Sequence, residues 1–167
     1  LKSLLSQGID TFHTCYCEFN LPAEHAAAVC REIIAQGLGD RIKWFAYCSI
    51  TPFDSELADL FRRAGCAGID FGADSGCDDI LRGLGRHFDA EDLRRTAKHC
   101  RRAGIPFMYD LLVGGPGETR QTVMETINLV RNLEADCVGV AMGMRVYEGT
   151  RMAELVRSEG HLERNPN

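Results

Sequence analysis

A chain of 167 residues with 45% hydrophobic residues is long enough for one domain with a sizeable core and too short for two ordinary domains. Its 19 basic and 24 acidic residues give a formal net charge of -5, which argues against a nucleic-acid-binding surface. No apolar run approaches the roughly 18 residues of a membrane span, and the N-terminus has no secretion signal, so we expect a soluble cytoplasmic protein without a membrane partner.

Short apolar runs alternate along the chain with longer segments of helical periodicity. The apolar runs, rich in Val, Ile, Phe, Tyr and Cys, are typical of strands buried on both faces; they cover residues 9–15, 42–48, 66–73, 105–113 and 137–144. Helices are predicted between them, because capping residues precede the periodic segments and glycines follow them. The predicted starts are Pro22, Asp54, Asp89 and Thr119, and the predicted ends are Gly37, Gly65 and Gly104.

Each unit therefore follows the order strand, loop, helix, which predicts a parallel α/β sheet with right-handed crossovers. Five units fall short of a closed (β/α)8 barrel, so an open or partial TIM-like barrel is the more economical architecture, and a doubly wound sheet is the alternative. In both folds the functional residues lie just beyond the carboxyl ends of the strands.

Two kinds of residue have mainly structural interpretations. The dense basic run is predicted to be the solvated face of one helix; it comprises Arg94, Arg95, Lys98, Arg101 and Arg102. Several of the eight cysteines fall in apolar segments, where a free thiol behaves as a small buried hydrophobe, and this favours a reduced compartment over a disulfide framework. These cysteines are Cys30, Cys48, Cys66, Cys100 and Cys137.

The exit of the fourth apolar run is the most informative segment. A buried run breaks into Gly114, Gly115, Pro116, Gly117 and Glu118 before a helix begins. These glycines permit close approach of a flat or anionic group to the backbone, beside helix-start amides. A ligand shelf and a tight turn with Thr119 as its cap both fit this pattern. A phosphate-binding P-loop and a dinucleotide fingerprint do not fit.

Two other exits carry polar residues. Asp74 and Ser75 follow the third run, where they could hydrogen-bond a sugar diol or could cap a short helix over residues 78–84. Arg145 lies within an apolar stretch, so we expect its guanidinium to meet a carboxylate of a neighbour or of a ligand.

The first run ends in a segment that contains Cys15, Cys17 and Glu18. One Cys-x-Cys pair is weak metal evidence, so no metal ligand is assigned to it.

Five segments in a fixed order resemble the radical S-adenosylmethionine (SAM) superfamily, and within it the cobalamin-binding iron-sulfur oxidoreductases. The segments are CEFNLPAEHA, WFAYCSITPFD, RRAGCAGIDFGADSG with the following LRGLGRHFDAEDLRRTAKHCRRAGI, DLLVGGPGET, and GMRVYEGT. The resemblance implies a partial (βα)6 barrel whose [4Fe-4S] cluster is bound by CxxxCxxC after the first strand. That motif is absent here, so residues 1–167 are interpreted as strands two to six of a radical SAM core domain, without the first strand and the cluster loop.

The resemblance also implies roles for the strand exits. Asp74 and Ser75 would lie near the ribose and methionine of SAM, Gly114 to Glu118 would form the shelf beneath adenine and methionine, and Arg145 would close the far side. Glu18 would approach the methionine amino group, although the acidic or glycine-rich pattern of the family is replaced here by the Cys-Tyr-Cys sequence at residues 15–17.

The parent enzyme would reductively cleave SAM to a 5'-deoxyadenosyl radical for methyl transfer, cyclisation or rearrangement of a small-molecule substrate. It would take electrons from a flavodoxin or ferredoxin, and it could carry cobalamin in an upstream domain. We expect this chain alone to be inactive, because it lacks the cluster motif. Two alternatives stay open: a non-redox βα domain that binds an anion or cofactor at Gly114 to Gly117, and a degenerate scaffold that supports a partner.

Overall fold

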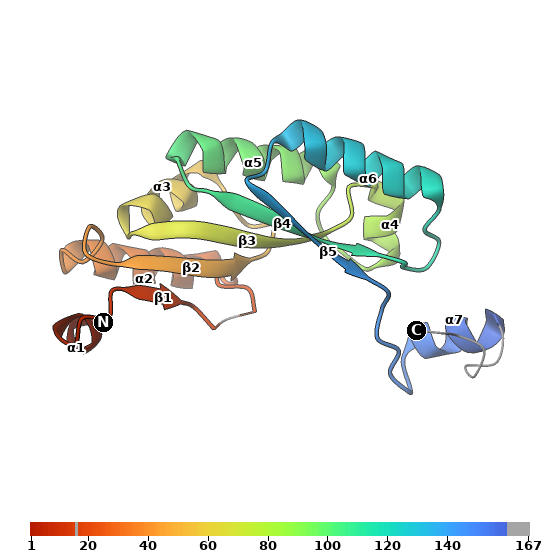
Figure 1. The fold of residues 1–167 in the computed structure, drawn as a ribbon, viewed down its shortest axis with the longest axis horizontal. Helices are drawn as coiled ribbons and strands as arrows, with labels where there is room; N and C mark the ends of the chain where they lie inside the picture. Colours follow the sequence, from red (N-terminus) through yellow and green to blue (C-terminus); the bar gives the residue numbers. More distant parts are fainter. Residues whose placement is uncertain (16, 160–167) are drawn as a thin grey trace.

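The computed structural model describes residues 1–15 and 17–159, which form one parallel sheet of five strands with helices (Figure 1). The strands follow each other across the sheet in chain order: β1 (Thr11–His13), β2 (Lys43–Cys48), β3 (Cys66–Asp74), β4 (Phe107–Val113) and β5 (Cys137–Met142). All four pairings are parallel. This order, with each crossover leading to the adjacent strand, is that of a barrel wall.

Seven helices accompany the described strands, and capping side chains mark where three of them begin. They are α1 (Lys2–Ser6), α2 (Ala23–Ala35), α3 (Ser55–Arg63), α4 (Asp78–Gly83), α5 (Ala90–Ala103), α6 (Arg120–Leu133) and α7 (Arg151–Glu159). The side chains of Asp54, Asp89 and Thr119 accept hydrogen bonds from the first turns of α3, α5 and α6. These caps satisfy backbone N–H groups that a helix leaves unpaired, so the predicted helix starts are confirmed.

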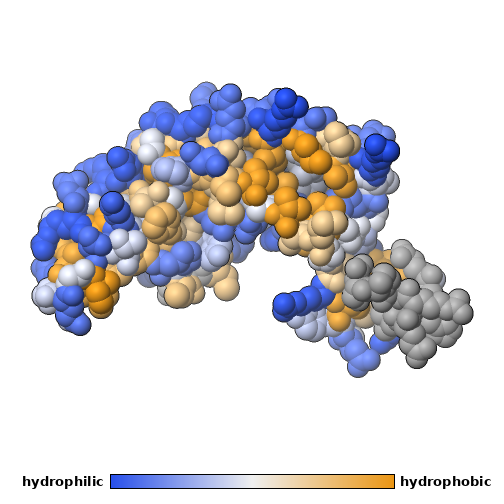
Figure 2. Space-filling view, in the orientation of Figure 1, coloured by the Kyte–Doolittle hydropathy of each residue, from blue (hydrophilic) through white to orange (hydrophobic). Residues whose placement is uncertain are grey.

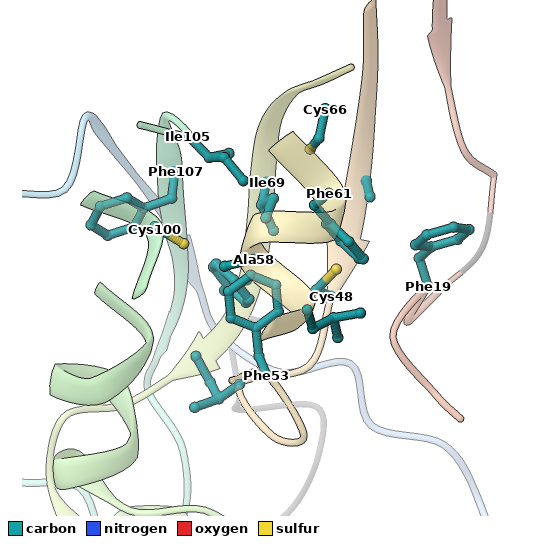
Figure 3. Close-up of a cluster of buried hydrophobic side chains, with 14 of the residues drawn as sticks. Phe19, Cys48, Phe53, Ala58, Phe61, Cys66, Ile69, Cys100, Ile105 and Phe107 are labelled. Atoms are coloured by element: carbon teal, nitrogen blue, oxygen red, sulfur yellow. The ribbon is translucent and has the colours of Figure 1, made fainter. Parts of the chain in front are cut away.

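The core lies between one face of the sheet and helices α2, α3 and α5. Alternate residues of β2 point into this core, where Trp44, Ala46 and Cys48 are buried. Figure 3 shows Phe53 and Phe61 in this core, together with Cys48 of β2 and Ile69 of β3. Their rings meet nearly edge to face, with centroids 5.6 Å apart, which is a favourable aromatic arrangement.

The opposite face of the sheet is concave and open. Figure 2 shows the arch-like outline of the molecule, hollowed on its underside, and Figure 1 shows α7 set apart beyond the end of β5. Phe45 and Tyr47 of β2 point to this side and are 41% and 43% exposed. Helices α2 to α6 cover the convex side of this curled sheet, so the partial barrel is confirmed over the doubly wound alternative.

Some details differ from the sequence prediction. The first and last strands are shorter than predicted and end at His13 and Met142. Cys137 is exposed, because it begins edge strand β5 and lines the open side of the sheet. The other four cysteines predicted to be buried are buried, and all five residues of the basic run are exposed on α5, as predicted. Within the described residues, no helix is long and apolar enough to cross a membrane.

Candidate functional site

Three of the predicted site segments follow the carboxyl ends of three adjacent strands. Asp74 ends β3, Gly114 follows β4, and Arg145 lies three residues beyond β5, and these three strands are neighbours in the sheet. Because parallel strands end at the same edge, their exits gather on one rim, which is where barrel enzymes place their sites.

The loop after β4 is both a capped turn and an open backbone shelf. Gly114 and Gly117 have φ angles of 96° and 76°, a region that favours glycine. The Glu118 carboxylate accepts a hydrogen bond from the Gly114 N–H, and Thr119 caps α6. A β-carbon placed on Gly117 would meet no atom within 4 Å. The loop is thus closed by the bond between Glu118 and Gly114, while Gly117 borders open space.

A hollow of about 1160 Å³ joins this loop to the segment after β5. Residues 114–118, residues 142–148 and one side of α7 line it. Arg145 is exposed, and no ion pair joins it to a carboxylate of the described residues, so of the two expected partners a carboxylate of a ligand stays a prediction. Its exposure arises because β5 ends at Met142, which leaves Arg145 in an irregular segment facing the hollow instead of in a buried strand.

Asp74, at the end of β3, interacts with another residue of the protein. Asp74 has a φ of 56°, at a point where the register between β3 and β4 shifts, and its carboxylate pairs with Arg86 at 2.5 Å. Such irregularities re-aim side chains at the ends of strands. Asp74 therefore points along the rim toward Arg86, and it does not line the hollow of residues 114–118.

Ser75 is fully buried and serves the connection between β3 and α6. Its hydroxyl lies 3.0 Å from the Thr126 hydroxyl and accepts a hydrogen bond from the Cys77 N–H at 3.1 Å. The Thr126 hydroxyl also accepts from the Gly76 N–H at 2.9 Å. Ser75 thus fixes the approach to α4, close to the capping role considered from the sequence, and α4 has no side-chain cap of its own.

Glu18 lies apart from the other predicted residues. It follows β1, three strands from β4 in the sheet, or about 14 Å at the usual strand spacing. Its side chain is half-buried, whereas Cys15 and Cys17 are exposed. Within residues 1–15 and 17–159, no group of three or more His, Cys, Asp or Glu side chains is placed to hold a metal ion.

Two carboxylates on the concave face, Asp70 of β3 and Asp110 of β4, were not predicted from the sequence. Burial, and then the neighbouring Asp110 carboxylate, raise the pKa of Asp70 to about 6, while His13 opposes the shift. The available signal was an aspartate in the middle of each of two apolar strands. Perturbed carboxylates in a concave surface are typical of functional sites.

Comparison with known proteins gives relatives along most of the chain. A Tryptophan 2-C-methyltransferase from Streptomyces laurentii is 34% identical over 158 residues, which cover 87% of this chain and 26% of that protein. An uncharacterized methyltransferase from Pyrococcus horikoshii is 26% identical over 136 residues, which cover 81% of this chain and 29% of that protein. The chain thus spans about a quarter of the length of these relatives.

Solved structures agree in fold. The radical SAM methyltransferase TsrM from Kitasatospora setae, solved with cobalamin and a [4Fe-4S] cluster bound, matches with a TM-score of 0.85 and 34% identity over 95% of this chain and 32% of that one. The cobalamin-dependent radical SAM enzyme OxsB shares the fold, with a TM-score of 0.65 and 15% identity over 95% of this chain and 24% of that one. Residues 1–130 match the family model of the radical SAM superfamily. This chain therefore belongs to the radical SAM superfamily.

Proposed function

We propose that this chain forms the SAM-binding wall of a radical SAM enzyme that transfers a methyl group to a small-molecule substrate. The observation that carries the proposal is the rim hollow of about 1160 Å³, in which the Gly114 to Glu118 shelf faces Arg145. The 34% identity to a tryptophan methyltransferase favours methyl transfer over cyclisation or rearrangement. The electron donor would be a flavodoxin or ferredoxin, and the free cysteines favour a cytoplasmic setting.

The described residues fit SAM. The shelf offers glycine backbone that a planar adenine can approach, since the space beside Gly117 is open. Arg145, which forms no ion pair with the residues that the structure describes, offers a cation for the methionine carboxylate. When bound, SAM would supply the methyl group or the 5'-deoxyadenosyl radical. The residues of the chain would hold it in place and exclude water from the rim.

The described residues do not fit a [4Fe-4S] cluster. CxxxCxxC is absent from the sequence, and the described side chains offer no cluster of metal ligands. We therefore assign the cluster ligands to parent sequence outside this chain. Cobalamin is likewise assigned to an upstream domain of the parent.

Calorimetric titration of the chain with SAM tests the shelf. Arg145→Ala should weaken SAM binding about tenfold, as expected for the loss of one charged contact of about 1.4 kcal/mol. Gly115→Leu should weaken it similarly by occupying the shelf; Gly115 has an ordinary backbone conformation, and its added β-carbon would have only ordinary contacts, at 3.6 Å or more. Arg41→Ala is the matched control, because Arg41 is exposed and lies just before β2, at the amino ends of the strands and so opposite the rim.

Two outcomes would contradict the proposal. Equal SAM affinity in the wild type and in both rim variants would remove the shelf from the binding site. Binding of inorganic phosphate with no binding of SAM would favour the non-redox, anion-binding alternative.

A further inference from the structure

Another hollow lies on the concave face of the sheet, at the amino-terminal halves of the strands. Its volume is about 360 Å³, and its lining extends from β1 across to β5. Met108, in this lining, comes six residues before Gly114 along the chain, so the hollow is about 20 Å from the glycine shelf. A molecule in this hollow is therefore too far from the rim to react with SAM held there.

The concave face of a half barrel corresponds to the interior of a closed barrel. In small closed barrels this interior is a packed core that side chains fill. Here the face is open, and two of its aromatic side chains, Phe45 and Tyr47, are 41% and 43% exposed. Exposed apolar groups that gather in one hollow are typical of a surface that another part of a protein covers. The hollow is thus suited to a side chain from another segment of polypeptide.

Asp70, in the lining of the hollow, has an oxygen without a hydrogen-bond donor. Its Oδ1 atom is buried, and no group of the described residues donates to it. An oxygen in this state is costly unless a donor reaches it. Burial and the neighbouring Asp110 carboxylate raise the pKa of Asp70 to about 6, so most of this carboxyl group is ionised at neutral pH. A cationic donor would satisfy the oxygen and offset the repulsion from Asp110.

The other polar groups of the lining also favour a cation. The described lining contains the carboxylates of Asp70 and Asp136 and no lysine or arginine. One oxygen of Asp136 accepts a hydrogen bond from the Phe107 N–H at 3.0 Å. His13 supplies an imidazole, and its ring centroid lies 4.9 Å from that of Tyr47. The excess of carboxylates makes the hollow complementary to a positive charge and unfavourable for an anion.

A guanidinium group matches this lining better than an ammonium group. It is planar and weakly hydrated, it stacks on aromatic rings, and its donors form a fork that suits a carboxylate. Phe45 and Tyr47 provide the aromatic rings, and Asp70 provides the acceptor. A lysine ammonium is a compact, strongly hydrated charge that gains less from an aromatic wall.

We propose that this hollow is a docking socket for one arginine side chain, carried by a segment of the parent polypeptide outside residues 1–167. The guanidinium would donate to Asp70 Oδ1 and lie against Tyr47, which would hold that segment on the open face of the half barrel. The same polypeptide is the favoured source, because the residues matched in the 34% identical relative make up only 26% of that protein. The inference goes beyond the proposed function and does not depend on it, since it concerns the amino ends of the strands.

Three tripeptides that differ in one side chain test the socket. They are the acetylated and amidated sequence alanine-arginine-alanine and its two analogues with citrulline or lysine in the middle. Citrulline keeps the shape of arginine and removes its charge. Titration of the 167-residue chain, followed by its amide NMR signals, locates the bound peptide and measures its affinity. We expect the arginine peptide to shift the signals of Tyr47, Asp70 and Met108, the citrulline peptide to bind about tenfold more weakly, and the lysine peptide to bind severalfold more weakly.

Variants of the lining test which groups hold the guanidinium. Asp70→Asn should weaken binding of the arginine peptide about tenfold, as expected for the loss of one charged hydrogen bond. Tyr47→Leu should weaken it severalfold without changing a charge. Asp59→Asn is the matched control, because Asp59 is an exposed aspartate of α3 that pairs with Arg102 outside the hollow. Circular dichroism of each variant shows whether it is folded.

Three results would overturn the socket. Binding of the arginine peptide could be absent in the wild type, unchanged in Asp70→Asn, or matched by the citrulline peptide. Equal binding of the lysine peptide would overturn the assignment to arginine. The SAM affinity should be the same in the wild type and in Asp70→Asn, so this test and that of the rim site fail independently.

The thiol of Cys137 shows whether the parent protein fills the socket itself. Cys137 lines the hollow and is exposed in this chain, so iodoacetamide should alkylate it. In the parent protein the inserted segment should protect it, and Asp70→Asn should increase its alkylation severalfold, as measured by mass spectrometry of peptides. Equal alkylation in the parent protein and in this chain would overturn the assignment to the parent. Dimers of this chain in sedimentation that Asp70→Asn abolishes would overturn it in favour of a second copy.

Discussion

Two aspartates of β3, Asp70 and Asp74, are held in unfavourable states. Asp74 has a left-handed backbone at the end of β3, which costs a non-glycine residue about 1 kcal/mol. The Oδ1 atom of Asp70 is buried, and within residues 1–15 and 17–159 no group donates a hydrogen bond to it. Such unfavourable features persist where a ligand or a mechanism uses them.

Asp70 should make the stability of the chain depend on pH. Its pKa is about 6 in the folded chain against an ordinary value of 3.8, so the folded state holds this proton more tightly than the unfolded state. The stabilisation from protonated Asp70 is therefore present below about pH 4 and is lost as the pH rises through about 6. After allowance for solvent screening, we expect a loss of about 1 kcal/mol.

Urea unfolding from about pH 4 to about pH 7 measures this loss as the difference between the wild type and Asp70→Asn. The subtraction removes the contributions of other carboxylates, such as Asp89, whose pKa is lowered by hydrogen bonds from the α5 backbone. Parallel pH profiles for the two proteins would show that Asp70 titrates normally.

At the scale of elements, β3 and α6 are joined by a small buried hydrogen-bond network. The Thr126 hydroxyl lies 3.0 Å from the Ser75 hydroxyl and accepts a hydrogen bond from the Gly76 N–H at 2.9 Å. A β-carbon on Gly76 would lie 2.8 Å from the Leu129 side chain, so only glycine fits there. This close contact fixes α6, and with it the shelf that precedes the helix.

Thr126→Val should destabilise the chain by about 1 to 3 kcal/mol, because at nearly unchanged volume it leaves the Gly76 N–H without its acceptor and removes the hydrogen bond between the Ser75 and Thr126 hydroxyls. Denaturant unfolding measures the change. Thr11→Val is the control, since Thr11 is exposed and its hydroxyl donates to the carboxylate of its neighbour Asp10, and it should change stability by less than about 0.5 kcal/mol. Equal effects of the two substitutions would contradict the structural role of the network.

Helix starts were predictable from the sequence because their signals are local. Asp54, Asp89 and Thr119 cap helices within three residues of themselves. The ends of β1 and β5 were less predictable, because apolar residues such as Met144 continue past the last pairing. The bond from Ser75 to Thr126 spans 51 residues, and the Asp70 and Asp110 pair depends on register between strands. Neither could be read from spacing along one segment.

At the scale of the whole molecule, the described residues form half a barrel whose concave face is open. β1 and β5 are both edge strands, and the hollow of residues 114–118 and 142–148 lies beyond the carboxyl ends of β4 and β5. In the proposed function, this half barrel would hold SAM at its rim. It would provide positioning, while the source of electrons would depend on a cluster that needs thiolate ligands.

The cysteines of this chain are poorly suited to provide those ligands. Burial raises the pKa of the Cys30 and Cys66 thiols to about 12 and also raises the pKa of Cys48 and Cys100, so these four thiols stay protonated at neutral pH. Among the described cysteines, Cys15, Cys17 and Cys137 are exposed, and they do not gather with other ligands.

We therefore expect the chain, treated with iron, sulfide and then dithionite, to release no 5'-deoxyadenosine from SAM above a protein-free control. Mass spectrometry of the product and the charge-transfer absorption of the protein are the two measurements. Product formed by the wild type and lost in the Cys15→Ser, Cys17→Ser double variant would contradict this expectation, because the two exposed thiols after β1 would then supply cluster ligands. Calorimetric binding of SAM without cleavage would separate the positioning role of the half barrel from the redox step of the parent enzyme.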